Sequence, residues 1–235
     1  MSFTEEKKKR FLREIRSWKV SPKLFSRLSN VIDSKEVQIA YSKIEPLVKN
    51  IITRKEVQSA ISEVATNIER SNRYSDEIVD IIMSKEVTPK QMSILGLMCY
   101  LTLSEGCFSE AIQLISSILI ENHHDLYHTE RMRFVRSYKE LDKVSLFVKL
   151  QFVELHGFKF VTNAYNRKLR NCIAHLTYTV EDDGTILNNR TGTKIENLWD
   201  KILKLQNMMI MLAIVFVDFR IDLEEQTEPS FKQEP

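Results

Sequence analysis

The chain has 235 residues, of which 43% are hydrophobic and 28% charged, and it contains only five glycines and five prolines. This composition excludes a disordered chain, a collagen-like repeat and a turn-rich β-sandwich, and it favours a mostly helical protein with a buried core. Because 34 Lys and Arg residues nearly balance 32 Asp and Glu residues, the formal net charge of +2 does not by itself indicate a nucleic-acid or a membrane partner.

The cysteines and the apolar segments predict a cytoplasmic protein. Cys99, Cys107 and Cys172 are odd in number and lack the spacing of a disulfide framework or a metal site, which favours free, buried thiols in a reducing compartment. The charged N-terminal segment lacks the hydrophobic stretch of a secretory signal. The longest apolar run, Met208 to Val217, has 10 residues against the ~20 needed to span a bilayer. We therefore predict a buried helix there and no membrane partner.

The first part of the chain has the periodicity of short helices. Apolar residues recur at helical spacing between Val37 and Ile82. Residues 1–30 contain nine Lys and Arg against three Asp and Glu. A basic start can follow a phosphate backbone, although such charge runs usually form solvated helix faces. We assign residues 1–88 to an N-terminal helical region whose role the sequence does not define.

A second region begins at Thr88-Pro89, because proline is tolerated in the first turn of a helix. The periodicity predicts helices near 90–103, 108–122, 129–155, 159–176 and 195–219, with a break at Gly157. Between the last two helices, the alternation at Tyr178 and the pair Asp183-Gly184 predict a β-hairpin. The predicted fold class is all-α: a helical bundle over 89–221 with a small hairpin, followed by a disordered acidic tail, 222–235.

The most informative segment precedes the hairpin and runs from Tyr165 to His175. On a helix with 100° per residue, Arg167, Asn171 and His175 fall on one stripe, with Arg170 and the small Ala174 beside it. The opposite side of this helix carries the apolar residues Val161, Tyr165, Leu169, Cys172 and Leu176. One face therefore presents two guanidinium groups, an amide and an imidazole.

This set of groups suits phosphodiester chemistry on RNA. The planar fork of Arg170 matches phosphate oxygens, His175 transfers protons near neutral pH, and Asn171 can orient either group. RNA supplies its own nucleophile, since the 2′-hydroxyl can attack the adjacent phosphorus, and the sequence therefore predicts no metal or other cofactor. The reaction needs both a general base and a general acid, but the helix face holds only one histidine. We therefore expect a twofold homodimer to supply the second histidine.

The run Arg170–His175 resembles the R-x4-H motif of the HEPN-domain family, in the form in which Asn follows the Arg. The resemblance extends over roughly residues 90–220 and includes the helix before the hairpin. It implies a helical bundle that dimerises face to face, with metal-independent endoribonuclease activity in many members, often as toxins or antiviral effectors. By position, Arg170 and His175 take the catalytic roles and Asn171 the polar place beside the Arg. Members paired with a nucleotidyltransferase antitoxin often carry a tyrosine two residues after the histidine, where this chain has Thr177.

The sequence thus predicts an endoribonuclease with Arg170, His175 and Asn171 as catalytic residues and Arg167 as a substrate-binding residue. The expected partners are RNA and a second copy of the chain, and an antitoxin or regulatory protein is a further candidate. The alternative is a catalytically inactive HEPN-like dimerisation module that binds RNA or a protein partner, because arginines and histidines at an interface serve recognition as readily as catalysis.

Two further pairs of residues, one of histidines and one of acidic residues, are candidates for a metal site and for positioning His175. His124 and His128 have the spacing of the zinc motif H-E-x-x-H, but Asp125 replaces the glutamate, and no metal site is predicted. Glu140 and Asp142 lie on the predicted helix 129–155, and either is a candidate to orient His175.

Overall fold

The computed structural model describes residues 3–17, 22–49, 55–84, 86–122, 138–141 and 143–227. These residues form α-helices, one π-helical segment and a small sheet, which confirms the predicted all-α class with a hairpin. The first helices are α1 (Glu5–Ser17), α2 (Pro22–Val31), α3 (Lys35–Lys49) and α4 (Lys55–Ser84). They confirm the helical character predicted for the N-terminal region.

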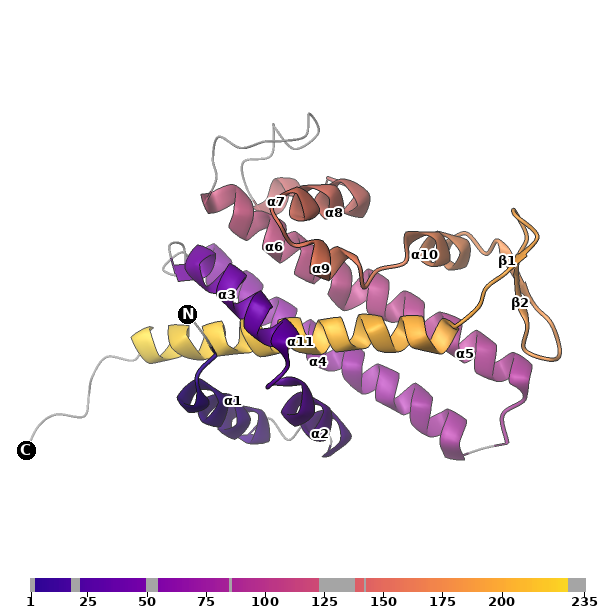
Figure 1. Cartoon of the computed structure of the whole chain (residues 1–235), viewed down its shortest axis with the longest axis horizontal. Helices are drawn as coiled ribbons and strands as arrows, with labels where there is room; N and C mark the ends of the chain where they lie inside the picture. The colour runs from indigo at the N-terminus through magenta and orange to yellow at the C-terminus, as the bar shows by residue number, and fades with distance from the viewer. Residues whose placement is uncertain are drawn as a thin grey trace, which may run out of the picture.

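The long helix α11 (Leu198–Thr227) forms the centre of the fold, and Figure 1 shows it running lengthwise through the middle of the molecule. It contacts α1, α2, α3, α4, α5 and the π-helical segment. The apolar run predicted to be buried is buried from Met209 to Val217, and Met208 is half-buried. A helix that is apolar on all sides needs such complete coverage.

Two described segments are long and apolar enough to cross a membrane by length and composition alone, Pro89–Asn122 and Leu198–Asp222. Of the apolar window in the second segment, 78% is buried inside the protein, which is the burial expected of a core helix. The absence of a membrane partner stays a prediction.

Helices from both predicted regions share one hydrophobic core. The buried side chains of α3 and α4 belong to the same cluster as those of α5, α6 and α11. The boundary predicted at residues 88–89 therefore coincides with a helix start and not with a gap between two cores. At the other end, α11 continues to Thr227, into the tail that was predicted to be disordered, and residues 228–235 lie outside the described residues.

The helices predicted near 90–103 and 108–122 form one continuous helical path. It consists of α5 (Pro89–Thr102), the π-helix η1 (Leu103–Phe108) and α6 (Ser109–Asn122). The start at Thr88 is confirmed by a capping box, in which the backbone N–H of Gln91 donates to Thr88 Oγ1 at 3.2 Å and the backbone N–H of Thr88 donates to Gln91 Oε1 at 2.9 Å. The π-helix keeps Leu103 and Phe108 buried while Glu105 stays exposed.

The prediction of a single helix over 129–155 is wrong for the residues that the structure describes. Two helices, α7 (Tyr138–Leu141) and α8 (Leu146–Leu155), are separated by a turn. The turn ends at Ser145, whose extended backbone occupies the N-cap position of α8, where serine is favoured. Residues 123–137 and 142 lie outside the described residues, and His124 and His128 are among them.

The helix predicted over 159–176 is also divided, into α9 (Lys159–Thr162) and α10 (Arg167–Ala174). Asn166 begins α10 as its N-cap, since its side chain accepts a hydrogen bond from the backbone N–H of Leu169 at 2.9 Å. The backbone N–H of Asn166 donates to the Tyr100 hydroxyl at 2.7 Å, so the cap is anchored to α5. The predicted break at Gly157 is confirmed, with φ of +87° between α8 and α9.

The hairpin after α10 is confirmed and extended by a third strand. The antiparallel order is β1 (Tyr178–Val180), β2 (Ile186–Asn188) and β3 (Thr193–Lys194). The turn residue Gly184 has φ of +84°, and its carbonyl accepts a hydrogen bond from Ser93 Oγ on α5 at 2.6 Å. Figure 1 places α10 and the sheet together at one end of the molecule, beside α5.

A buried ionic network holds α1 against the central helix. Asp218 of α11 is fully buried and accepts hydrogen bonds from Lys7 Nζ at 3.1 Å and from Arg10 Nη2 at 2.8 Å. The Tyr41 hydroxyl of α3 donates to the same carboxylate at 3.0 Å. Asp222, one turn further along α11, pairs with both cations. The network compensates the charge of Asp218, which is buried next to the apolar run of α11.

The same network predicts a loss of stability at alkaline pH. Burial lowers the pKa of Lys7, but the nearby carboxylates of Asp218, Asp222 and Glu45 raise it by more, so the pKa lies above its ordinary value of 10.5. Burial, and after it the charge of Asp218, raises the pKa of Tyr41 above its ordinary value of 10.0. The folded state therefore holds both protons more tightly than the unfolded chain, so this stabilisation is complete below the unfolded pKa values and is lost as pH rises through the folded ones.

We expect the free energy of unfolding, measured with urea at a series of pH values, to fall above about pH 10. Lys7→Met and Tyr41→Phe should each reduce this alkaline slope, because each removes one group whose pKa is raised by folding. An unchanged slope in both variants would show that the network does not cause the decline.

Candidate functional site

Helix α10 has the two faces that the sequence predicted. Its inner face buries Leu169, Cys172 and Ile173. On the outer side Arg167 is exposed, and Arg170 and Asn171 are half-buried. The other predicted apolar residues are not on this helix: Val161 belongs to α9, and Tyr165 lies in the turn before α10.

The C-terminus of α10 places His175 in the open. His175 is the C-cap residue, exposed, and its backbone N–H donates to the carbonyl of Asn171 at 3.1 Å. Leu176 follows with φ of +51°, and the backbone N–H groups of Leu176 and Thr177 donate to the carbonyls of Ile173 and Cys172, each at 3.0 Å. This is a Schellman motif with leucine where glycine is usual.

Leu176 was predicted on the apolar side of the helix, and that prediction is wrong. Its side chain is 75% exposed, because the helix ends at Ala174 and the left-handed residue turns the chain away from the bundle. A non-glycine residue in this conformation costs of order 1–3 kcal/mol. An exposed leucine on strained backbone therefore lies directly beside His175.

Three of the four predicted site residues line one cleft. The cleft has a volume of about 420 Å³, between the start of α8 and α10, and its walls are Ser145, Leu146, Phe147, Leu150, Tyr165, Arg167, Arg170 and Asn171. Arg167, Arg170 and Asn171 are thus brought together, as the helical spacing predicted. His175 is not a wall residue of this cleft and lies at the end of the helix.

The guanidinium of Arg170 is held by two neighbours. Its Nε donates to Glu105 of the π-helix in a very short ion pair, and its Nη1 donates to Asn171 Oδ1 at 3.0 Å. The hydrogen bond to Glu105 raises the pKa of Arg170, so its positive charge is permanent at any working pH. Asn171 is thus a direct hydrogen-bond partner of Arg170, and Glu105 neutralises part of the positive charge of Arg170.

Glu105 was missed by the sequence reasoning. A signal was present, because it is the only charged residue between Lys90 and Glu110. The predicted candidates to orient His175 were Glu140 and Asp142; Glu140 is exposed on α7, and Asp142 lies outside the described residues.

Because Glu105 competes with any anion for Arg170, its removal should strengthen phosphate binding. We expect Glu105→Gln to bind a 2′-O-methyl oligonucleotide up to about fivefold more tightly in fluorescence anisotropy, which corresponds to a partly exposed ion pair. Glu181→Gln changes the net charge equally at an exposed site in the hairpin and is the matched control. If both variants gain equally, the effect is one of net charge and not of this ion pair.

Two aromatic side chains, Phe147 and Tyr165, also line the cleft. The guanidinium carbon of Arg167 lies 3.7 Å from the centroid of the Phe147 ring, a cation–π contact. The ring of Tyr165 stacks on buried Phe108 with a centroid separation of 5.2 Å and an interplanar angle of 11°. Burial raises the pKa of Tyr165, so its hydroxyl stays protonated to a higher pH than that of an exposed tyrosine. The sequence reasoning missed Phe147, because nothing local marks it as a neighbour of α10.

The cysteines do not belong to this site. All three are free and buried, as predicted. Burial raises the pKa of Cys107 to about 12, which makes its thiol unreactive. Among the residues that the structure describes, no group of three or more His, Cys, Asp or Glu side chains is arranged to hold a metal ion.

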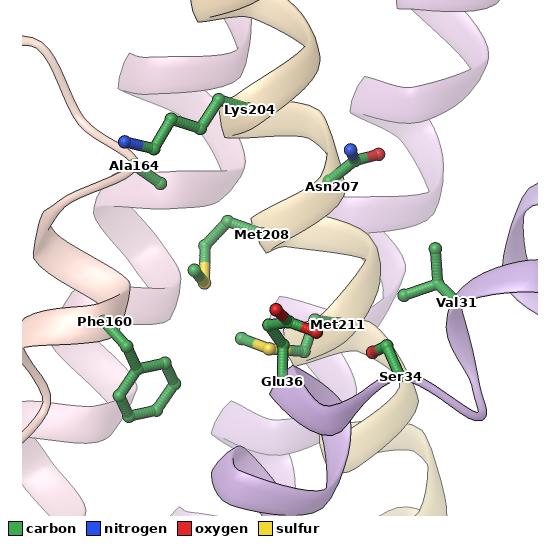
Figure 2. A pocket seen from close by; sticks show the side chains of 9 residues that line it. All are labelled: Val31, Ser34, Glu36, Phe160, Ala164, Lys204, Asn207, Met208 and Met211. Carbon is green, nitrogen blue, oxygen red and sulfur yellow. The ribbon is translucent and has the colours of Figure 1, made fainter.

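A second pocket of about 460 Å³ lies between α11, α9 with its following turn, and the junction of α2 and α3. Figure 2 shows Met208 and Met211 reaching from α11 toward Phe160, with Lys204 and Glu36 also bordering the space. Its walls are mainly apolar, and it shares no residue with the cleft on α10.

Comparisons with known proteins add no assignment: no family model, no curated protein and no solved structure matches the chain.

Proposed function

We propose that the protein is a metal-independent endoribonuclease of the HEPN type, with a composite site at a homodimer interface. The observation that carries the proposal is the arrangement of the motif on α10, in which Arg170 and Asn171 open onto a cleft while His175 is exposed at the end of the same helix. Neither Arg170 nor His175 is enclosed in the hydrocarbon core, so both can meet a sugar-phosphate strand.

The proposed reaction uses the substrate's own nucleophile. The 2′-oxygen attacks the adjacent phosphorus, the bond from phosphorus to the 5′-oxygen breaks, and the products carry a 2′,3′-cyclic phosphate and a 5′-hydroxyl. One His175 takes the 2′-proton, and the His175 of the second copy gives a proton to the departing 5′-oxygen. Arg170 stabilises the negative charge that develops on the phosphorane oxygens, with Asn171 fixing its orientation. Arg167 binds the neighbouring backbone phosphate.

A second copy of the chain would complete this site. His175 does not line the cleft of its own chain, so the proposal brings the Arg170 and His175 of both copies together across a twofold axis. Leu176 supports such an interface, because it exposes 75% of an apolar side chain beside His175 and keeps a strained backbone there. The protein would act in the cytoplasm as a toxin or antiviral effector, with an antitoxin or regulatory protein as a further partner.

One observation favours the alternative, a catalytically inactive module that dimerises and binds RNA or a protein. The ion pair between Glu105 and Arg170 satisfies the guanidinium without a phosphate. Such a pair suits a recognition surface, in which the arginine is held ready but does not act on a reacting group.

Incubation of the purified protein with total RNA in EDTA tests the proposal. The expected result is cleavage that persists in EDTA and leaves 2′,3′-cyclic phosphate and 5′-hydroxyl ends, by a protein that sediments as a dimer. Absence of cleavage with retained RNA binding would favour the inactive module, and cleavage by a strict monomer would contradict the composite site.

A further inference from the structure

The cleft beside the motif has an aromatic wall that the proposed chemistry does not use. Phe147, in the first turn of α8, leaves 37% of its surface exposed at the cleft. The apolar neighbours Val148 and Leu150 on the same helix are buried. An exposed ring bordering a cleft with two arginines is therefore a feature to explain.

The Arg167 guanidinium stacks on the Phe147 ring. Its carbon lies 3.7 Å from the ring centroid, over the ring, while Arg167 itself remains exposed. Unpaired bases stack on aromatic rings and on guanidinium planes. Another wall residue, Tyr165, is held in place because its ring is stacked on buried Phe108.

We infer that this cleft is a nucleobase subsite that selects unpaired RNA. One base would stack on this pair of Phe147 and Arg167 while the attached phosphate reaches Arg170. The volume of about 420 Å³ lies within the range of small-ligand sites, about 300–1,000 Å³. In a duplex the base faces are covered by their neighbours and cannot enter, so unpaired strands are selected. The inference rests on the proposed function for the identity of the polymer, whereas stacking itself needs no cleavage.

The subsite should tolerate different bases. Its polar wall groups besides the arginines are Ser145, Asn171 and the Tyr165 hydroxyl, and the amide oxygen of Asn171 is already used by Arg170. Stacking on a ring or a guanidinium is available to every base, because every base has a π-face. We therefore expect the subsite to distinguish unpaired from paired strands but to distinguish only weakly between base sequences.

The test measures binding apart from cleavage. A labelled 2′-O-methyl oligonucleotide cannot be cut by 2′-hydroxyl attack, and it is offered to the full-length protein both unpaired and annealed to its complement. The variants are Phe147→Ala, Phe147→Leu and Phe147→Tyr, with Leu155→Ala as the matched control. Leu155 is an exposed apolar residue on the same helix that does not line the cleft. A 2-aminopurine base in the strand reports stacking through fluorescence quenching.

We expect the unpaired strand to bind at least tenfold more tightly than the duplex. Phe147→Ala and Phe147→Leu should each weaken its binding about tenfold and relieve the quenching, since stacking on one ring is worth ~1–3 kcal/mol per base. Phe147→Tyr and Leu155→Ala should behave as the wild type. Phe147→Leu keeps the apolar bulk, so a loss in this variant, with unchanged thermal unfolding, assigns the effect to the ring.

Equal binding of unpaired and duplex strands, or unchanged binding by Phe147→Leu, would overturn the inference. Its failure is separable from that of the proposed nuclease. Cleavage of ordinary RNA by the wild type without these binding effects would retain the nuclease and reject the base subsite. The binding effects without any cleavage would retain the subsite and reject the nuclease.

Discussion

Replacement of either Arg170 or His175 by alanine is expected to lower the rate of RNA cleavage by roughly 100- to 1,000-fold. This is the loss seen when one group that stabilises developing charge, or one acid–base group, is removed from an active site. Neither change should alter thermal unfolding by more than about 1 kcal/mol, because His175 is exposed and the ion pair of Arg170 with Glu105 is partly exposed. Single-turnover cleavage of a defined RNA in EDTA measures the effect.

Lys168→Ala is the matched control for these two variants. It removes an exposed cation from the same helix, and Lys168 does not line the cleft. Wild-type rates in this control would show that general charge on α10 is not the cause. Retained cleavage in both Arg170→Ala and His175→Ala, from preparations free of contaminating nuclease, would reject the assignment of the motif.

Mixing the two inactive variants tests the composite site directly. If the two copies share one site, a dimer that contains one chain of each variant keeps one Arg170 and one His175 there, whereas a dimer of either variant alone lacks one of these groups entirely. After random exchange about half of the dimers are mixed, so the activity of the mixture should rise clearly above that of either variant alone. A site built within one chain would recover no activity in the mixture, and that outcome would contradict the shared arrangement.

The largest stability effect is expected from Asp218→Asn. The substitution keeps the shape of the side chain but leaves Lys7 and Arg10 beside a neutral group, with only about a fifth of each side chain exposed to water. Breaking a buried ion pair in this way costs about 3 kcal/mol. For a protein of this size we expect a fall in Tm of about 6–12 °C, measured by calorimetry or circular dichroism.

Asp222→Asn is the control for that change. Asp222 contacts the same two cations, but its side chain is 23% exposed. Water can therefore replace more of the hydrogen bonds that this substitution removes. The expected destabilisation is therefore smaller than for Asp218→Asn. A stability loss below about 1 kcal/mol in Asp218→Asn would show that the network contributes nothing to the attachment of α1.

The sequence determined the features that depend on local periodicity and capping. The start of α5 at Thr88, the burial of Met209 to Val217 and the two faces of α10 follow from residues close together in the chain. These signals are local because a helix brings residues three and four apart onto one face, and because a cap satisfies its own first turn. The fold class could be predicted in this way, and so could three residues of the candidate site, Arg167, Arg170 and Asn171.

Only the tertiary structure decided what surrounds the motif. The contact of Glu105 with Arg170 joins residues 65 positions apart, and the ring of Phe147 reaches Arg167 from another helix. The split of the helix predicted over 159–176, which leaves Tyr165 in a turn, depends on Tyr100 of α5 binding the cap residue Asn166. Periodicity fixes which face of a helix is buried but not which side chains of other helices meet the exposed face, because that choice is made by packing of the whole core.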